Sequence, residues 1–191
     1  MKDTRQRILD AAMRVFAREG VSGATTREIA RLAKVNEVTL FRSFKNKNEL
    51  LRQVIIQHSQ RSVHIFADAP LKTKADLRRT VHTYAESYVR RLHEKEDFVR
   101  TFLGELNRHL QLCRRLFVES VKPTRQKFIQ YLQAAQKNRL VRRDLDTSTA
   151  VDALTGMLLS GVIRRPLTDS VYPNKRYVKT SVEIFLKGIE R

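Results

Sequence analysis

Polar and basic side chains gather at the starts of two short segments with helical patterns. Thr26 and Arg27 open a segment of about eight residues, and Asn36 and Glu37 open another ten residues later. Arginine can fork onto a guanine edge, asparagine can pair with adenine, and glutamate can accept from a cytosine amine. Helix N-termini also present partial positive charge and free N–H groups to phosphates. These residue types therefore predict recognition of DNA.

Catalytic and metal-binding patterns are not recognisable in the sequence. There is no nucleophile elbow and no glycine-rich phosphate loop, and the five histidines lie outside any catalytic motif. His109 and Cys113 are four residues apart, but two ligands are too few for a zinc site. Because Cys113 is the only cysteine, it cannot form an internal disulfide. We therefore expect no enzyme activity, no cofactor and no metal.

The elements that position these groups are predicted to be helices throughout. The 191 residues include only four Pro and six Gly, and apolar residues recur with a period near 3.6. Thr25 with Glu28 forms a capping-box pattern, and Asn36 is a suitable cap for the segment after it. The sequence predicts an all-α fold of about nine helices. A three-helix DNA-binding domain at 1–50 precedes a larger helical bundle at 51–191, with a bridging helix from about residue 47.

Two short helices joined by a tight turn are typical of a helix-turn-helix in a basic chain. The second helix would enter the major groove, which is about 12 Å wide and admits one helix end. A plain three-helix mini-bundle gives a similar spacing and remains an alternative on these features alone.

Three stretches of the first domain resemble the TetR family of bacterial transcription regulators. They run from Arg7 through Phe16 to Gly20, from Thr25 to Val35, and from Thr39 to Leu51. The resemblance covers about a quarter of the chain in the right order and spacing. Beyond it, the chain is similar to the family only in its expected all-α bundle of suitable length. The resemblance implies a homodimeric repressor that leaves a palindromic operator when a small-molecule effector binds.

The same resemblance assigns the residues that would contact DNA at the two helix starts and beside them. They are Thr26, Arg27, Asn36, Glu37, Val38, Thr39, Phe41, Arg42 and Lys47. For Glu37, complementing the helix dipole is favoured over contact with a cytosine. Lys34 stands where the family often has glycine, and a left-handed lysine costs about 1 kcal/mol. Phe41 replaces a common tyrosine and therefore lacks a hydroxyl for a phosphate.

The second domain is expected to contain the dimer surface on its last two helices, at 147–164 and 175–189. Their apolar and small residues suit a four-helix bundle made by two subunits. Burial within one subunit is the alternative, because a helix that is apolar all round must be buried somewhere. The predicted interface residues are Leu154, Met157, Leu158, Gly161, Val178, Val182 and Phe185.

A ligand pocket is expected among the helices between residues 74 and 138. Its candidate lining residues are Tyr84, Tyr88, Phe102, Leu106, His109 and Cys113. An ordinary packing role is favoured for most of them, since aromatic residues at helical spacing are usually part of a core. Pro123 predicts a kink or a break in a helix over 112–138.

The charge is strongly positive and lies mostly outside the expected DNA reader. The net charge is +18 and the pI is near 10.7. Residues 51–191 hold 27 Lys or Arg against 14 Asp or Glu. This excess is either a solvated surface with non-specific attraction for DNA or a sign of an anionic effector.

These features predict a cytoplasmic transcriptional regulator with double-stranded DNA, a second copy of itself and an unknown small molecule as partners. The longest uncharged apolar stretch worth testing is Ala153–Ile163, well short of the roughly 20 residues of a membrane span. A charged start excludes a signal peptide, so no membrane role is expected. The alternative function is a non-specific or architectural DNA-binding protein.

Overall fold

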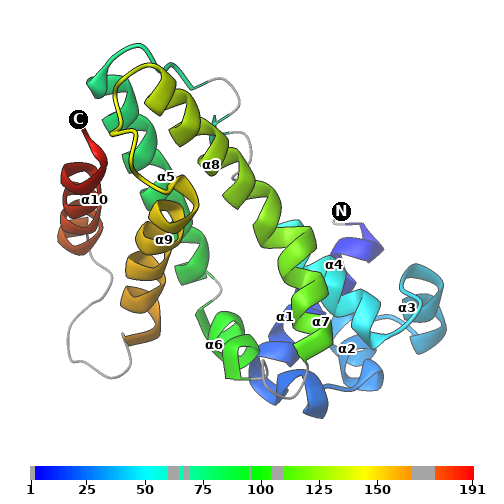
Figure 1. The fold of residues 1–191 in the computed structure, drawn as a ribbon. Helices are drawn as coiled ribbons and strands as arrows, with labels where there is room; N and C mark the ends of the chain where they lie inside the picture. Colours follow the sequence, from blue (N-terminus) through cyan, green and yellow to red (C-terminus); the bar gives the residue numbers. More distant parts are fainter. Residues whose placement is uncertain (1–2, 60–64, 67–68, 95, 105–109, 165–174) are drawn as a thin grey trace. The chain divides into compact units, whose positions relative to one another are not determined.

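A computed structural model describes residues 3–59, 65–66, 69–94, 96–104, 110–164 and 175–191. These residues form ten α-helices and one π-helical segment, so the all-α prediction is confirmed. The chain makes two compact units (Figure 1). Unit 1 comprises Met1–Gln60 with Lys95–Val121, and unit 2 comprises Arg61–Glu94 with Lys122–Arg191. No helix in the described ranges is both long and apolar enough to cross a membrane.

Unit 1 is built around its first helix. Its helices are α1 (Thr4–Gly23), α2 (Thr26–Ala33), α3 (Glu37–Ser43), α4 (Lys47–Ser59), α6 (Glu96–Gly104), α7 (Leu110–Leu116) and the π-helical η2 (Phe117–Val121). Helix α1 contacts α2, α4 and α6. Ile8, Val15 and Phe16 are at most 1% exposed in its core, as their helical spacing predicts. Gly20 has φ 72° and interrupts α1 at the predicted left-handed position.

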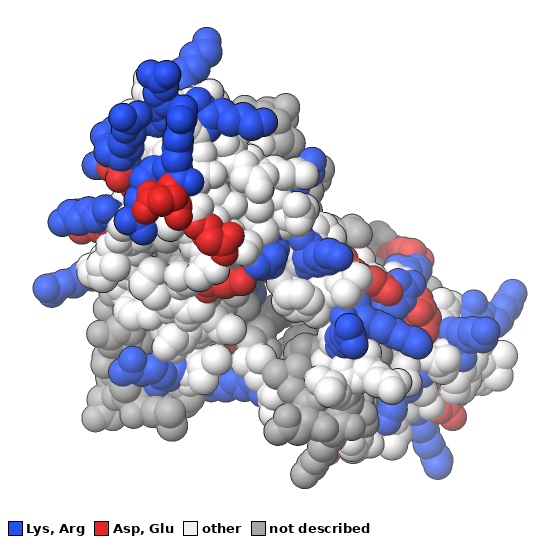
Figure 2. All heavy atoms as spheres, in the orientation of Figure 1, with Lys and Arg blue, Asp and Glu red and all other residues white. Residues whose placement is uncertain are grey.

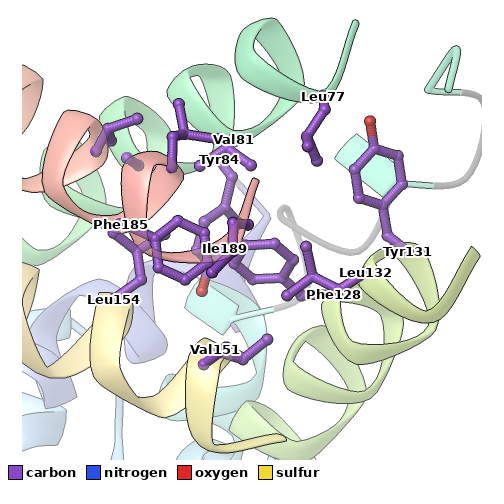
Figure 3. Packing of buried hydrophobic residues seen from close by; sticks show 14 of the residues in the cluster. Leu77, Val81, Tyr84, Phe128, Tyr131, Leu132, Val151, Leu154, Phe185 and Ile189 are labelled. Atoms are coloured by element: carbon purple, nitrogen blue, oxygen red, sulfur yellow. The ribbon is translucent and has the colours of Figure 1, made fainter. Parts of the chain in front are cut away.

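Unit 2 packs four helices around a cluster of aromatic rings (Figure 3). They are α5 (Lys74–Glu94), α8 (Lys122–Lys137), α9 (Thr147–Arg164) and α10 (Lys175–Ile189). Phe128 stacks on Phe66 with 4.7 Å between ring centroids, and it lies 4.7 Å from the Tyr84 ring. Phe185 of α10 reaches the same cluster. This core joins α5, α8 and α10, and α9 closes it with Leu154 and Val151.

Local sequence signals place several helix ends correctly. The bounds of α9 and α10 are those expected from the sequence. The π-helical segment η2 ends two residues before Pro123, where a kink or break is predicted. Proline lacks an N–H and its ring crowds the preceding turn, which accounts for the lost α-helical geometry there. The apolar periodicity of the sequence also predicts helices over about 47–68 and 97–110, and both of these ranges run into residues outside the described ones.

The compact unit that contains the DNA-reading segment is larger than residues 1–50. Helix α6 packs against α1, and Phe98 of α6 lies beside the core of that helix. Helix α4 contacts α7 and η2, and Arg52 of α4 forms an ion pair with Glu119 at 2.6 Å. Non-local contacts of this kind carry no signal in local periodicity. The functional boundary at residue 50 stays a prediction.

Candidate nucleic-acid interface

Helix α2 and the turn after it are defined by local hydrogen bonds. The Thr25 side chain accepts from the backbone N–H of Glu28 at 3.2 Å, which is the predicted N-cap. At the other end, Lys34 adopts φ 55° and ψ 50°, in the left-handed region. The N–H groups of Lys34 and Val35 donate back to the carbonyls of Arg31 and Ala30. This closed turn directs the chain into α3.

Helix α3 exposes nearly its whole surface. Asn36 caps it by accepting from the backbone N–H of Val38 at 3.0 Å, as predicted. Leu40 is its buried residue and is 0% exposed, whereas Val38 is 65% exposed and Phe41 is 48% exposed. Exposed apolar side chains beside polar ones suit the thymine methyl groups of a major groove.

Besides Asn36, three of the predicted DNA-contacting side chains have partners within unit 1: Thr26, Glu37 and Lys47. The Thr26 hydroxyl donates to a Glu37 carboxylate oxygen at 2.9 Å and so ties the start of α2 to the start of α3. The Lys47 ammonium donates to the Ala24 carbonyl at 2.9 Å and to the Ser22 carbonyl at 3.4 Å. Glu37 and Lys47 therefore position the two short helices. A third ammonium N–H of Lys47 remains for a phosphate.

Arg27, Lys34 and Arg42 present exposed cations on this face. Neither Arg27 nor Arg42 forms an ion pair in the part of the chain that the structure describes. The half-buried Thr39 lies among them on α3. Figure 2 shows basic side chains standing out from unit 1 and, separately, from unit 2. Cations without internal partners are available to neutralise phosphates.

Residues outside the sequence prediction brace the reading helices. Glu28 accepts from Arg31 of its own helix at 2.8 Å and from Arg18 of α1 at 3.2 Å. Hydrogen bonds from Arg31 and then Arg18 lower the pKa of Glu28 to about 2. Arg7 donates to the Lys34 carbonyl at 3.5 Å. Contacts of this kind join separate helices, so the residue periodicity of either helix does not predict them.

Lys34→Gly should raise the stability of unit 1 and weaken DNA binding. Glycine adopts the left-handed conformation without strain, so the free energy of unfolding should rise by about 1 kcal/mol. The loss of an exposed cation should reduce the salt dependence of binding by about one phosphate contact. Denaturant unfolding and binding titrations at several salt concentrations check both effects. A destabilised Lys34→Gly protein would contradict the interpretation.

The predicted ligand residues fall in different parts of the structure. Tyr84 is buried in unit 2, where the half-buried Tyr88 lies next to it at 5.8 Å between ring centroids. Cys113 is buried in unit 1. Leu106 and His109 lie outside the described residues, as does the Phe102 side chain. Among the described members of this set, Tyr84 and Tyr88 lie side by side within one unit.

The predicted dimer residues mostly face the interior of unit 2. Six are buried there and Met157 packs against the same core; the six are Leu154, Leu158, Gly161, Val178, Val182 and Phe185. This is the burial within one subunit that the sequence left open as an alternative. The outward faces of the same helices carry other residues, including Ile163 at 39% exposure and Ile184 at 59%.

A capped helix, a left-handed turn and a short exposed second helix together define a helix-turn-helix DNA-binding protein. The family model for bacterial regulatory proteins of the tetR family matches residues 8–54. Over nearly its full length, the chain is 28% identical to an uncharacterized HTH-type transcriptional regulator, YvkB, from Bacillus subtilis, covering 99% of this chain and 98% of that protein. Residues 8–54 therefore carry the DNA-binding segment of the tetR family, and the relative that matches nearly the whole chain is a transcriptional regulator.

Solved structures with the same fold cover the whole chain. The fatty acid degradation regulator FadR from Bacillus halodurans superposes with a TM-score of 0.82 at 22% identity, covering 100% of this chain and 99% of that one. SmeT, the repressor of the Stenotrophomonas maltophilia multidrug efflux pump SmeDEF, superposes with a TM-score of 0.73 at 20% identity, covering 100% and 92%.

Proposed function

We propose that this transcriptional regulator is a homodimeric repressor that reads a palindromic operator with α3. The observation that carries the proposal is the exposed α3, which is held at its start by the Asn36 cap and has Leu40 as its buried residue. Thr39, Val38, Phe41 and Arg42 supply base or phosphate contacts, and Arg27 with the α2 N-terminus supplies another. The amide N–H groups of Asn36 remain available, because its Oδ1 is used in the cap.

The outward faces of α9 and α10 support a dimer formed through these helices. Ile163 and Ile184 are large exposed apolar residues, and Gly156 is exposed on α9, seven residues before Ile163. A Cβ at Gly156 or Gly188 would meet nothing within 4 Å in the protomer. Glycine inside a helix costs about 0.5–1 kcal/mol relative to alanine, so packing within the protomer does not account for either residue. Close approach of a second copy of the chain would account for glycine at both positions.

Effector control and the cytoplasmic location complete the proposal. An effector bound in unit 2 releases DNA if it favours a state in which the two reading heads no longer match the operator half-sites. SmeT, which shares this fold, is a repressor of a multidrug efflux pump. The chain would meet its DNA in the cytoplasm of a bacterium.

Selection of genomic fragments by the purified protein tests this function. At about physiological salt, non-specific binding is weak, so an enriched palindrome is expected. Binding that fades with salt and selects no motif would instead favour the architectural alternative. The observation that favours this alternative is the large positive charge of residues 51–191, outside the DNA-reading helices.

Arg27→Ala should weaken operator binding by about 1–3 kcal/mol if Arg27 reads a base, with a relaxed preference at one operator position. A loss that is equal on all sequences would make Arg27 a phosphate contact. Arg143→Ala, which removes an exposed arginine of unit 2, serves as the charge-matched control. Binding titrations against the operator and single-base variants distinguish these outcomes. An unchanged affinity would exclude Arg27 from the interface.

A further inference from the structure

Arg91 is a half-buried arginine in the last turn of α5, among aromatic side chains. Its guanidinium donates to the Ser87 hydroxyl one turn earlier at 2.5 Å. It also interacts electrostatically with Tyr84 and Tyr88. Positions 84, 88 and 91 follow i, i+4 and i+7 spacing, so the three side chains share one face of α5.

Within the described residues, Arg91 has no carboxylate partner at ion-pair distance. The carboxylate that acts on it electrostatically is Glu94, which is exposed and makes no ion pair with it. Burial lowers the pKa of Arg91, because removal from water disfavours its charged form. A cation near a helix C-terminus complements the dipole equally well from an exposed position. The dipole therefore does not explain why Arg91 is withdrawn from water.

The neighbouring phenols also lack partners in the described part of the chain. Tyr84 is 2% exposed, and neither its hydroxyl nor that of Tyr88 forms a hydrogen bond there. Burial raises the pKa of Tyr88 to about 12 and raises that of Tyr84 as well, so both phenols stay protonated and able to donate. The two phenols therefore present hydrogen-bond donors beside the half-buried Arg91 guanidinium, and three donors on one helix face suit an anionic acceptor.

We propose that Arg91, Tyr84 and Tyr88 bind the carboxylate of an amphipathic monocarboxylic acid, whose apolar part packs against the aromatic cluster of unit 2. This inference rests on the proposed effector control and specifies the chemical class of the effector. The planar guanidinium fork matches a carboxylate, and the phenols donate to the same oxygens. The single half-buried cation balances one negative charge, whereas a dianion would leave one charge without a partner in a partly desolvated site.

The position of Arg91 connects this site to DNA binding through the chain itself. Arg91 lies in the last turn of α5, which ends at Glu94, and unit 1 resumes at Lys95. A carboxylate held by Arg91 would order the end of the helix that leads into the DNA-binding unit. Differential affinity for two arrangements of that connection is sufficient to shift their populations.

Calorimetry of the full chain tests the site with octanoate, laurate and phenylbutyrate, each beside its methyl ester. The acids should bind at least about tenfold more tightly than the esters, as expected for hydrogen bonds to a charged group. Arg91→Gln should lower acid affinity by about 10- to 100-fold and leave ester affinity unchanged. Tyr84→Phe, which keeps the ring, should lower acid affinity by about three- to tenfold. Arg90→Gln, an exposed neighbour, should change neither.

Equal binding of acids and esters, or an unaltered acid affinity in Arg91→Gln, would overturn the assignment. Tighter binding of dodecyl phosphate than of laurate would overturn the monoanion class. Circular dichroism verifies that each variant is folded. If Arg91→Gln does not fold, Arg91→Lys takes its place in the titrations, because lysine keeps the charge but lacks the planar guanidinium fork.

Fragment selection on the same preparations separates this inference from the proposed function. Arg91→Gln should select the same DNA as the unaltered chain, but acids should no longer release it. If the chain bound acids through Arg91 but selected no DNA motif, the proposed repressor function would be refuted and the carboxylate site would stand. If the chain selected a DNA motif but bound no acid, the carboxylate site would be refuted and the repressor function would stand.

Discussion

Leu40→Ala should abolish specific DNA binding although it removes none of the side chains proposed to contact DNA. Helix α3 has seven residues, too few to be stable alone, and Leu40 is its buried anchor at 0% exposure. Deleting a buried leucine side chain costs about 2–5 kcal/mol. The expected result is a lower free energy of unfolding by that amount and loss of operator binding. Denaturant unfolding and gel-shift titration measure the two quantities.

Val38→Ala is the matched control, since Val38 lies two residues away and is 65% exposed. Its effect on stability should stay within about 0.5 kcal/mol. Any loss of binding should depend on the base that Val38 touches in the groove. A Leu40→Ala protein with unaltered stability and operator affinity would refute the role of Leu40 as the buried anchor within α3.

Ile184→Asp should convert the proposed dimer into a folded monomer. Ile184 is 59% exposed on α10, so an aspartate there is solvated in the protomer but would be buried and unpaired between two copies. A monomer engages one half-site at a time and loses the effective concentration that links the two readers. Operator affinity should therefore fall by about 100-fold or more. Light scattering after size exclusion and binding titration test these outcomes.

Gln133→Asp on α8 is the control, because Gln133 is also exposed but lies outside the proposed interface. Gly156→Leu gives a second, independent probe. Its added side chain meets open space in the protomer and blocks close approach of another copy. If both Ile184→Asp and Gly156→Leu remained dimeric, the interface would lie elsewhere.

Much of the DNA-reading element follows from neighbouring residues alone. The Thr25 and Asn36 caps, the left-handed Lys34 and the break at Gly20 all appear where the sequence predicts them. Each depends on interactions within a few residues, so its signal is local. The roles of the individual side chains toward DNA stay predictions, because they depend on a partner that the chain does not contain.

The sequence by itself determined the helices, their caps and the apolar stripe of each, because these are set by short-range hydrogen bonds and periodicity. Only the tertiary structure decided which apolar face of α9 turns inward and that Thr26 and Lys47 have partners within unit 1. It also decided that Arg91 is half-buried beside Tyr84 and Tyr88. Such pairings join residues distant along the chain, and the packing that selects them depends on all of the helices together.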